Sequence, residues 1–241
     1  MKKFLILITL FSLFSLSFAM EIRYFGHACF RIQFNSGVSV IIDPFSSNYP
    51  IPQTTADLII SSHEHGDHYN PNFLGKKVEI IVGTKDRGTE WNLFEKKIED
   101  IKIWNVPTFH DDAEGKKRGK NSITVIDGEG IRLVHLGDLG IVLTEKEIKL
   151  LGKVDILFIP VGGYYTLSQE EALKVINQIN PRIVIPMHYK TEYTQGWPIG
   201  TLEEFLKLVK ELKIVKFESS LLNISKDKLP KTTEIWILNY K

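Results

Sequence analysis

The segment SSHEHGDHYN, residues 61–70, gathers three histidines, a glutamate and an aspartate within six positions, directly after the apolar run ADLII. On an α-helix, residues two apart point about 200° apart around the axis, so His63 and His65 would face in different directions. In extended or looped backbone, alternate residues share a side, so His63, His65 and Asp67 converge while His68 turns the other way. This spacing favours two adjacent metal ions over a polar surface loop.

Further candidate ligands follow other apolar runs. His110 follows IKIWNVPTF, Asp138 follows IRLVHLG and His188 follows PRIVIPM. The ends of strands are where sheet proteins assemble their sites. A lone histidine there is more often an ordinary hydrogen-bonded side chain, but these three residues bring the ligand count to seven. Two ions that each keep an open position need about six or seven ligands. The candidate metal ligands are His63, His65, Asp67, His68, His110, Asp138 and His188.

Many short strands must position these ligands. Strands are expected at residues 22–25, 29–34, 38–42, 56–60, 78–82, 101–106, 122–126, 131–136, 154–159, 182–185 and 233–238. Helices are expected at residues 143–152, 168–179 and 201–212. Ser168 and Thr201 precede acidic first turns and are expected N-caps, and Gly152 is expected to end the first helix. Many strands with helices mainly in the second half predict an α/β sandwich without an internal linker.

The start of the chain differs in composition from the rest. With 241 residues, 43% of them hydrophobic, the chain suits one globular domain with a large core. Two lysines precede an apolar segment at residues 4–16, and the small-x-small sequence Ser17-Phe18-Ala19 follows. This layout predicts a signal peptide at 1–19 and one domain at 20–241, in the periplasm or secreted. The alternatives are an uncleaved anchor, which the short apolar run disfavours, and a cytoplasmic protein that starts at Met20.

The charge balance excludes one class of partner. The chain has 30 Lys and Arg against 29 Asp and Glu; without the two lysines of the signal peptide, 28 basic residues face 29 acidic ones, a net charge of −1. No basic surplus recruits nucleic acid or an anionic membrane, so we expect a small-molecule substrate and no membrane insertion after signal cleavage. The only cysteine, Cys29, rules out an internal disulfide and a multi-thiolate zinc site.

The cluster HEHGDH matches the motif H-x-H-x-D-H, on which the chain resembles the metallo-β-lactamase superfamily. Within it, the chain is similar to the branch of ascorbate-6-phosphate lactonase-like metal-dependent hydrolases. The matching segments, which lie between about Met20 and the C-terminus, are GHACF (26–30), IDP (42–44), RGKN (118–121), HLGDLG (135–140), PVGGYYT (160–166) and IPMHY (185–189). The resemblance implies an αββα sandwich, the metallo-β-lactamase fold, in a single domain with the metals at one edge.

The same resemblance implies how the ligands divide between two ions. One ion is held by His63, His65 and His110, the other by Asp67, His68 and His188, and Asp138 bridges them. Lactamases with a cysteine ligand have no counterpart here, because Cys29 lies far upstream beside a different motif. Dedicated β-lactamases lack the bridging aspartate, and nuclease branches usually carry a large additional domain for which this chain has no room.

This ligand set predicts hydrolysis. Nitrogen and carboxylate ligands without thiolates favour Zn²⁺, with Mn²⁺ or Fe²⁺ as alternatives. Two such ions lower the pKa of a shared water to roughly 7 and so generate hydroxide as the nucleophile. We expect it to attack a lactone, phosphoester or related ester-type bond, with Asp67 both ligating and orienting the nucleophile and accepting its proton. The alternatives are a non-enzymatic periplasmic metal-binding protein and an enzyme with β-lactamase side activity; ligands spread over five strand ends favour the hydrolase.

Two further residues have expected roles beside the ligands. His27, after Gly26 in a strand turn, is the second candidate catalytic residue; it either contacts the substrate or supports a ligand, or is a packed polar side chain. Asp43, before Pro44, either orients a metal-bound histidine or shapes a turn.

The remaining polar candidates carry weaker expectations. His135, three residues before Asp138, is interpreted as structural. Tyr164 and Tyr165 either line the pocket or pack against the core. Arg118 and Asn121 follow His110 on a loop rich in glycine and lysine, where they position either that loop or an anionic substrate.

Overall fold

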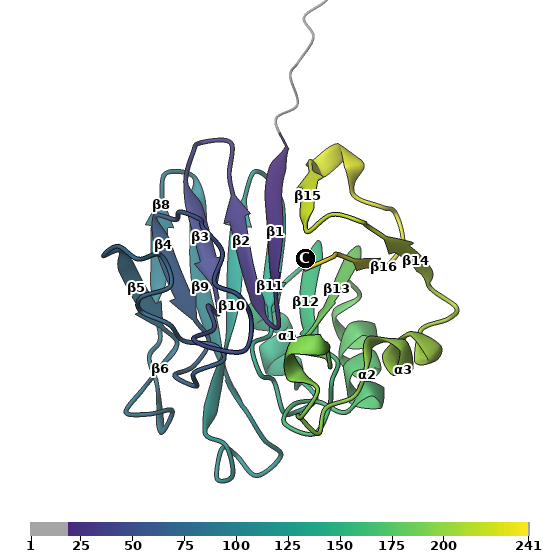
Figure 1. The fold of residues 1–241 in the computed structure, drawn as a ribbon. Helices are drawn as coiled ribbons and strands as arrows, with labels where there is room; N and C mark the ends of the chain where they lie inside the picture. Colours follow the sequence, from purple (N-terminus) through teal and green to yellow (C-terminus); the bar gives the residue numbers. More distant parts are fainter. Residues whose placement is uncertain (1–18, 241) are drawn as a thin grey trace, which may run out of the picture.

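Two β-sheets packed face to face form the body of the protein (Figure 1). The structure, a computed structural model, describes residues 19–240, so the expected signal peptide lies outside the described residues except for Ala19. The first sheet contains, in spatial order, β15 (Leu221–Ile224), β1 (Met20–Gly26), β2 (Cys29–Gln33), β3 (Ser39–Ile42), β4 (Leu58–Ser61) and β5 (Glu79–Val82). The second contains β14 (Lys213–Lys216), β16 (Glu234–Ile237), β13 (Ile183–Met187), β12 (Ile156–Pro160), β11 (Ile131–His135), β10 (Lys120–Gly128), β9 (Ile101–Phe109) and β8 (Glu95–Ile98).

The pairing of the strands changes within each sheet. In the first sheet, β1, β2 and β3 form the antiparallel meander that the sequence predicts, and β4 and β5 then continue in parallel. In the second sheet, β8 to β11 are antiparallel, whereas β11, β12, β13 and β16 are parallel. A separate two-stranded hairpin consists of β6 (Thr84–Lys85) and β7 (Glu90–Trp91).

The first two helices begin and end within two residues of their expected bounds, whereas the third, expected to reach residue 212, ends at Leu208. The helices are α1 (Glu145–Leu151), α2 (Gln169–Ile179) and α3 (Leu202–Leu208), with 3₁₀ turns η1 (Glu192–Thr194) and η2 (Lys226–Lys228). Ser168 caps α2, since its hydroxyl accepts from the backbone N–H of Glu171 at 3.2 Å and the Glu171 carboxylate bonds back to the Ser168 N–H at 2.9 Å. Gly152 ends α1 at φ +66°, which favours glycine. None of the helices within residues 19–240 is both long and apolar enough to cross a membrane.

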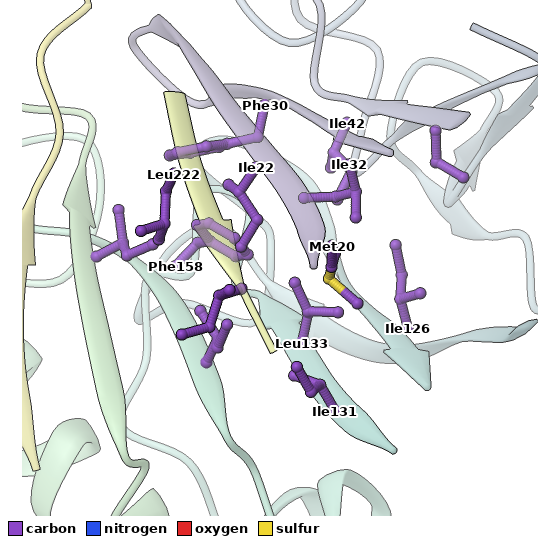
Figure 2. Packing of buried hydrophobic residues seen from close by; sticks show 14 of the residues in the cluster. Met20, Ile22, Phe30, Ile32, Ile42, Ile126, Ile131, Leu133, Phe158 and Leu222 are labelled. Carbon is purple, nitrogen blue, oxygen red and sulfur yellow. The ribbon is translucent and has the colours of Figure 1, made fainter. Parts of the chain in front are cut away.

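The main hydrophobic core lies between the sheets. Along β1, buried and half-buried residues alternate, as expected for a strand with one face on the core. Figure 2 shows Met20 and Ile22 of the first sheet beside Leu133 and Phe158 of the second. The ring centroids of Phe30 and Phe158 are 4.4 Å apart, so aromatic packing joins the two sheets directly.

The two outer faces of the sandwich are covered differently. All three α-helices of the described chain pack on the outer face of the eight-stranded sheet, where Leu151, Val175 and Phe205 are buried. Loops cover the outer face of the six-stranded sheet, through side chains such as Phe45 and Phe73. The predicted α/β sandwich is confirmed, but loops take the place of its second helical layer. Segment 43–78 contains prolines at 44, 50, 52 and 71, which oppose helix formation there.

Candidate metal centre

Five strands of the two sheets deliver the candidate ligands to one edge of the sandwich. His27 follows β1, the 63–68 cluster follows β4, His110 follows β9, Asp138 lies just past β11 and His188 follows β13. These strands are far apart in sequence, yet their polar ends form groups of potential metal-ligand atoms within 4.8 Å of one another. The structure therefore brings together all seven ligands that the sequence predicts, and adds His27 to them.

The first group contains His63, His65 and His110. Nε2 of His63 lies 3.0 Å from Nδ1 of His65, and the ring centroids of His65 and His110 are 5.1 Å apart. His63 and His110 are buried, while His65 is exposed toward solvent. Three imidazoles that converge in this way fit one divalent ion with a position left for another group.

The second group contains His27, Asp67, His68 and His188. Oδ2 of Asp67 lies 3.2 Å from Nε2 of His27 and 3.8 Å from Nε2 of His68. The imidazole rings of His27 and His188 are 4.1 Å apart, centroid to centroid. His27 thus lies among the candidate ligands and does not pack elsewhere in the core. Within the second group it contacts the Asp67 carboxylate.

Asp138 lies between the two groups. Its Oδ2 atom is 3.1 Å from Nε2 of His110 and 3.9 Å from Nε2 of His63, both in the first group. Its Oδ1 atom is 3.0 Å from Nε2 of His68 and 3.3 Å from Nε2 of His188, both in the second group. Each carboxylate oxygen therefore faces a different group, which is the arrangement that a bridging ligand requires.

Several of the converging atoms lack hydrogen-bond partners. Nε2 of His68, Nε2 of His188 and Oδ1 of Asp138 are buried and form no hydrogen bond of acceptable geometry in the described structure, although both nitrogens lie within ion-pair distance of this oxygen, at 3.0 and 3.3 Å. Buried polar atoms are normally satisfied, because an unpaired one costs about 1–3 kcal/mol. Nitrogen and oxygen atoms left unpaired at these separations fit coordination to divalent ions, so the residues present suit the metal centre that the motif implies.

Asp43 holds one histidine of each group in place. Its Oδ2 atom is 2.7 Å from Nδ1 of His68, which leaves Nε2 of that ring free for the site. The same carboxylate accepts from the Ser62 N–H at 2.6 Å and the Ser62 hydroxyl at 2.7 Å, and this hydroxyl lies 2.9 Å from Nδ1 of His63. Asp43 thus orients a candidate ligand, the first of its two expected roles, as carboxylates commonly do for metal-bound histidines.

A buried asparagine fixes the backbone at Asp138. Oδ1 of Asn121 accepts from the Asp138 N–H at 3.0 Å, while its amide donates to the Thr108 hydroxyl and to the Leu136 carbonyl, each at 2.9 Å. Gly137 precedes Asp138 at φ +56°, and a Cβ there would come within 2.4 Å of the Asn121 oxygen. Only glycine fits that position. Because the hydrogen bonds of Asn121 reach Asp138, Thr108 and Leu136, this residue supports the metal site and not the adjacent loop.

The backbone also connects His27 to His188. The His27 carbonyl accepts from the His188 N–H and from the Tyr24 hydroxyl, each at 2.9 Å. His135, in contrast, uses Nε2 toward the Ala28 carbonyl at 2.8 Å and Nδ1 to accept from the Gly137 N–H at 3.1 Å. Both of its ring nitrogens are engaged with the backbone, in agreement with a structural role.

The protonation of the site suits metal binding. Burial holds the pKa of His63 well below its usual value and that of His27 at about 4, so both rings are neutral at pH 7. Burial opposes ionisation of Asp138, but His188, His68 and His110 outweigh it and hold the pKa of this carboxyl well below its usual value. For His68, burial is outweighed by Asp138, Asp67 and Asp43, which raise its pKa. In the metal-free protein His68 therefore carries a proton that an ion would displace.

A cavity of about 450 Å³ opens onto both groups. Its lining combines candidate ligands with other side chains: Ser47, Asn48, His65, Gly66, Asp67, His110, Lys117, Arg118, Asp138, Tyr165, His188 and Trp197. The Trp197 ring stands edge-on to His27, with centroids 5.3 Å apart. Tyr165 lines this cavity, whereas Tyr164 is 62% exposed and does not. A cavity of this size admits a small molecule to the candidate ligands.

Three residues of the site were not predicted from the sequence. Ser62 connects Asp43 to His63, Asp111 binds the loop after His110, and Trp197 covers His27. The position of Ser62 beside the first motif histidine was the available signal for that residue. Trp197 follows the last predicted ligand by nine positions in an irregular segment, and no local pattern marks it.

A two-sheet α/β sandwich with histidines and aspartates gathered at one edge is the framework of a candidate metal-binding protein, and comparison with known proteins identifies its class. A family model described as the beta-lactamase superfamily domain matches residues 21–188. A UPF0173 metal-dependent hydrolase of Pyrococcus furiosus is 31% identical over 217 residues, which cover 80% of this chain and 93% of the relative. Another, of Methanopyrus kandleri, is 33% identical and covers 71% of this chain and 85% of the relative.

A solved structure extends the likeness to three dimensions. A crystal structure from Thermotoga maritima, described as a candidate Zn-dependent hydrolase of the metallo-β-lactamase superfamily, is 35% identical. It superposes with a TM-score of 0.68 and covers 91% of this chain and 98% of its own. The chain therefore belongs to the metallo-β-lactamase superfamily, and the predicted fold and enzyme class, a metal-dependent hydrolase of this superfamily, are confirmed.

Proposed function

We propose that this protein holds two divalent ions and hydrolyses an ester-type bond, in a lactone, a phosphoester or a related small molecule. The observation that carries the proposal is the position of Asp138, whose two carboxylate oxygens face different histidine groups. A single ion would leave one of these groups without a use, although both converge on the same 450 Å³ cavity.

The bound ions, Asp67 and His27 would have different roles in the proposed hydrolysis. Bound at this centre, the ions would supply hydroxide at neutral pH and would polarise the ester under attack. Asp67 is 26% exposed on its side chain and faces the cavity, so it is placed to orient a nucleophile and to accept its proton. His27 is neutral and lies 3.2 Å from Asp67, where its N–H fixes the orientation of that carboxylate. Of the two residues expected to be catalytic, we therefore assign Asp67 as the catalytic residue and His27 as the residue that positions it.

The donor set favours Zn²⁺ as the physiological ion. It consists of imidazole nitrogens and carboxylate oxygens without a thiolate, which suits zinc and is compatible with Mn²⁺ or Fe²⁺. The proposed ligands of one ion are His63, His65 and His110, and those of the other are Asp67, His68 and His188, with Asp138 between them.

We propose further that the enzyme works outside the cytoplasm, in the periplasm or after secretion. The tripartite N-terminal sequence carries this proposal. Cleavage after Ala19 would leave β1 complete, since that strand begins at Met20.

An activity screen tests the proposed function directly. Purified mature protein, stripped of metal and reloaded with Zn²⁺, Mn²⁺ or Fe²⁺, is assayed against lactones, phosphodiesters, phosphomonoesters and carboxylic esters. Metal content is measured on the same samples. We expect two ions per chain and turnover of at least one ester class that a chelator abolishes. Turnover that survives complete metal removal, or a fully loaded protein with one ion per chain, would contradict the proposal.

A further inference from the structure

A cavity of about 430 Å³ lies at the end of the sandwich away from the candidate metal ligands. The parallel strands β11, β12 and β13 begin there, whereas Asp138 and His188 follow the opposite ends of β11 and β13. β15, which ends just before η2, pairs with the start of β1, so the cavity is at the end of the sandwich that lies uppermost in Figure 1. The lining residues are Asp127, Gly130, Arg132, Lys153, Asp155, Arg182, Lys226 and Leu229.

The lining carries more positive than negative charge. Four of its residues are cations and two are carboxylates, which leaves a formal charge of +2. Both carboxylates are already engaged by arginines. Oδ2 of Asp127 accepts from Nη2 and, at 3.2 Å, from Nε of Arg132. Oδ1 of Asp155 lies 3.4 Å from Nε of Arg182. The uncompensated charge is therefore that of the two lysines.

Lys153 and Lys226 are both exposed, and no carboxylate within residues 19–240 pairs with either ammonium group. The side chain of Lys226 lies against the turn between β10 and β11. A Cβ on Gly130 would come within 3.0 Å of Nζ of Lys226, and the φ of +72° at this position favours glycine. The glycine thus admits the lysine side chain at the border of the cavity.

Arg182 brings further hydrogen-bond donors to the cavity. Its Nε faces Asp155, and its Nη1 donates to the Pro230 carbonyl at 3.2 Å. Nη2 forms no hydrogen bond with another residue of the described chain, so its two N–H groups are available to a ligand. Arg132 differs, because its guanidinium also donates to the Leu151 carbonyl at 3.1 Å and so satisfies the end of α1.

Backbone hydrogen bonds fix these groups relative to one another. The Asp155 N–H donates to the Arg132 carbonyl at 3.0 Å, and the Arg132 N–H donates to Oδ2 of Asp155 at the same distance. The Asp155 carbonyl accepts from the N–H groups of Arg182 at 3.1 Å and Ile183 at 2.9 Å. The starts of β11, β12 and β13 are therefore joined before any ligand binds, and a ligand has to order only the two lysine side chains.

The chemistry of this cavity favours a phosphate group. Such a group carries a charge of about −1.5 to −2 at pH 7 and several acceptor oxygens, which suits two unpaired ammonium groups and a guanidinium with free N–H groups. A carboxylate, with a single charge, would leave one lysine uncompensated. Leu229 is the one apolar side chain among the lining residues, so the cavity offers no surface on which an aromatic base could stack.

We propose that this cavity is a second ligand site, remote from the metal centre, which binds phosphate either as the free inorganic ion or as the phosphate group of a small polar metabolite. The site goes beyond the proposed hydrolysis and does not depend on it. A bound phosphate would connect the segment after α1, the start of β13 and η2 through Lys153, Arg182 and Lys226. It would thereby stabilise the folded chain.

Isothermal titration calorimetry tests the site with three ligands: inorganic phosphate, the phosphonate analogue of glycerol 3-phosphate, which a hydrolase cannot cleave, and acetate. Protein that is loaded with Zn²⁺ and freed of excess ion is compared with the double variant Lys153→Gln/Lys226→Gln. The matched control is Lys76→Gln/Lys77→Gln, which loses the same two charges from the exposed segment before β5, in the other sheet.

A second measurement locates the bound ligand, because metal ions also attract phosphate. Backbone ¹⁵N–¹H spectra recorded during each titration separate the two places. Binding in the remote cavity should shift the amide signals of Gly130, Lys153 and Lys226, whereas binding at the metal centre should shift those of residues 63–68.

We expect the remote cavity of the wild type to bind phosphate with a Kd below about 1 mM, and acetate at least about tenfold more weakly. Lys153→Gln/Lys226→Gln should lose at least about tenfold in phosphate affinity at this cavity, and the control variant should stay within about twofold of wild type. Tighter binding of the glycerol phosphate analogue than of inorganic phosphate would identify a metabolite as the ligand, and the reverse order would identify the free ion.

Four results would overturn the second site. They are signal shifts confined to residues 63–68, acetate bound as tightly as phosphate, phosphate affinity unchanged in Lys153→Gln/Lys226→Gln, and an equal loss of affinity in both double variants, which would show a general effect of net charge. None of these results bears on the hydrolase proposal, which the activity screen tests separately.

Discussion

Asp138→Asn is the most direct test of the dinuclear centre, because this change keeps the size of the side chain and removes its charge. In the wild type, Oδ2 faces Nε2 of His110 at 3.1 Å and Oδ1 faces Nε2 of His68 at 3.0 Å. Asparagine offers one oxygen and one NH₂ group, and an NH₂ group is not a ligand for a divalent ion. One of the two groups therefore loses its oxygen whichever way the amide is turned.

The expected effect is large on function and small on the fold. Loss of one ligand and one negative charge at the reacting centre should cost about 3 kcal/mol of transition-state stabilisation, a fall in turnover of about 100-fold or more. At least one ion should be bound more weakly. Asp138 follows the end of β11 and does not belong to the hydrophobic core between the sheets, so secondary structure should be unchanged.

The assay combines three measurements on the same preparation: metal content at saturating Zn²⁺, turnover of an ester from the activity screen, and circular dichroism. Asp100→Asn is the matched control, because Asp100 is exposed on the turn between β8 and β9 and undergoes the same chemical change. It should bind two ions and retain wild-type turnover. If Asp138→Asn also binds two ions normally and keeps wild-type turnover, the bridge is wrong and the ions lie elsewhere.

Three further predictions concern the support of the ligand histidines by Asp43, the protonation of His68 and the removal of the signal peptide. Asp43→Asn should weaken metal binding about 10–100-fold, because Asp43 orients His68 through a direct contact at 2.7 Å and His63 through the Ser62 hydroxyl. Competition with a chromogenic chelator measures the affinity, and an unchanged affinity would refute this role. Because the carboxylates raise the pKa of His68, that ring holds a proton at pH 7 which metal must displace. Calorimetry in buffers of different ionisation enthalpy should therefore detect proton release that declines as the pH rises through this pKa; release that is absent at pH 7 would contradict it. When the protein is expressed in a bacterial host, it should reach the periplasm with Met20 as its N-terminus. N-terminal sequencing of the periplasmic fraction checks this prediction. A soluble cytoplasmic product that keeps residues 1–19 would count against export.

The sequence predicted those strands and helices whose residue pattern is strong. α2 and α3 begin at their predicted N-caps, Ser168 and Thr201, because Ser, Thr and Glu at the right spacing satisfy the first backbone N–H groups locally. β14 and β15 were not predicted. β15 returns from the C-terminal part of the chain to pair with β1, with Met20 opposite Ile224. Such a pairing depends on contacts between residues about 200 positions apart in the chain. The four residues of β15, two of them buried, carry no distinctive period.

The candidate metal ligands could be predicted from the sequence, whereas most of the residues that support them could not. A metal ligand has a restricted chemistry, so imidazoles and carboxylates at the ends of apolar runs are visible without a structure. A supporting residue is defined by what it touches. Asp111 and Asp112 are adjacent and chemically identical, yet Asp111 is buried and accepts four N–H groups, whereas Asp112 is exposed and pairs with Lys117. Nothing in the local sequence separates the two.

The backbone at the site shows how these supports act. His27, Asp43 and His188 adopt φ values of +53°, +49° and +52°, in a region that non-glycine residues seldom occupy. Each such residue costs of order 1 kcal/mol or more, and it persists only where its surroundings fix it. Here the Asp43 carboxylate makes three short contacts and the His27 carbonyl accepts two hydrogen bonds, one from His188 itself. Glycine would relieve the backbone at these positions but would remove a ligand or its support, so the strain is a consequence of placing these side chains at one point.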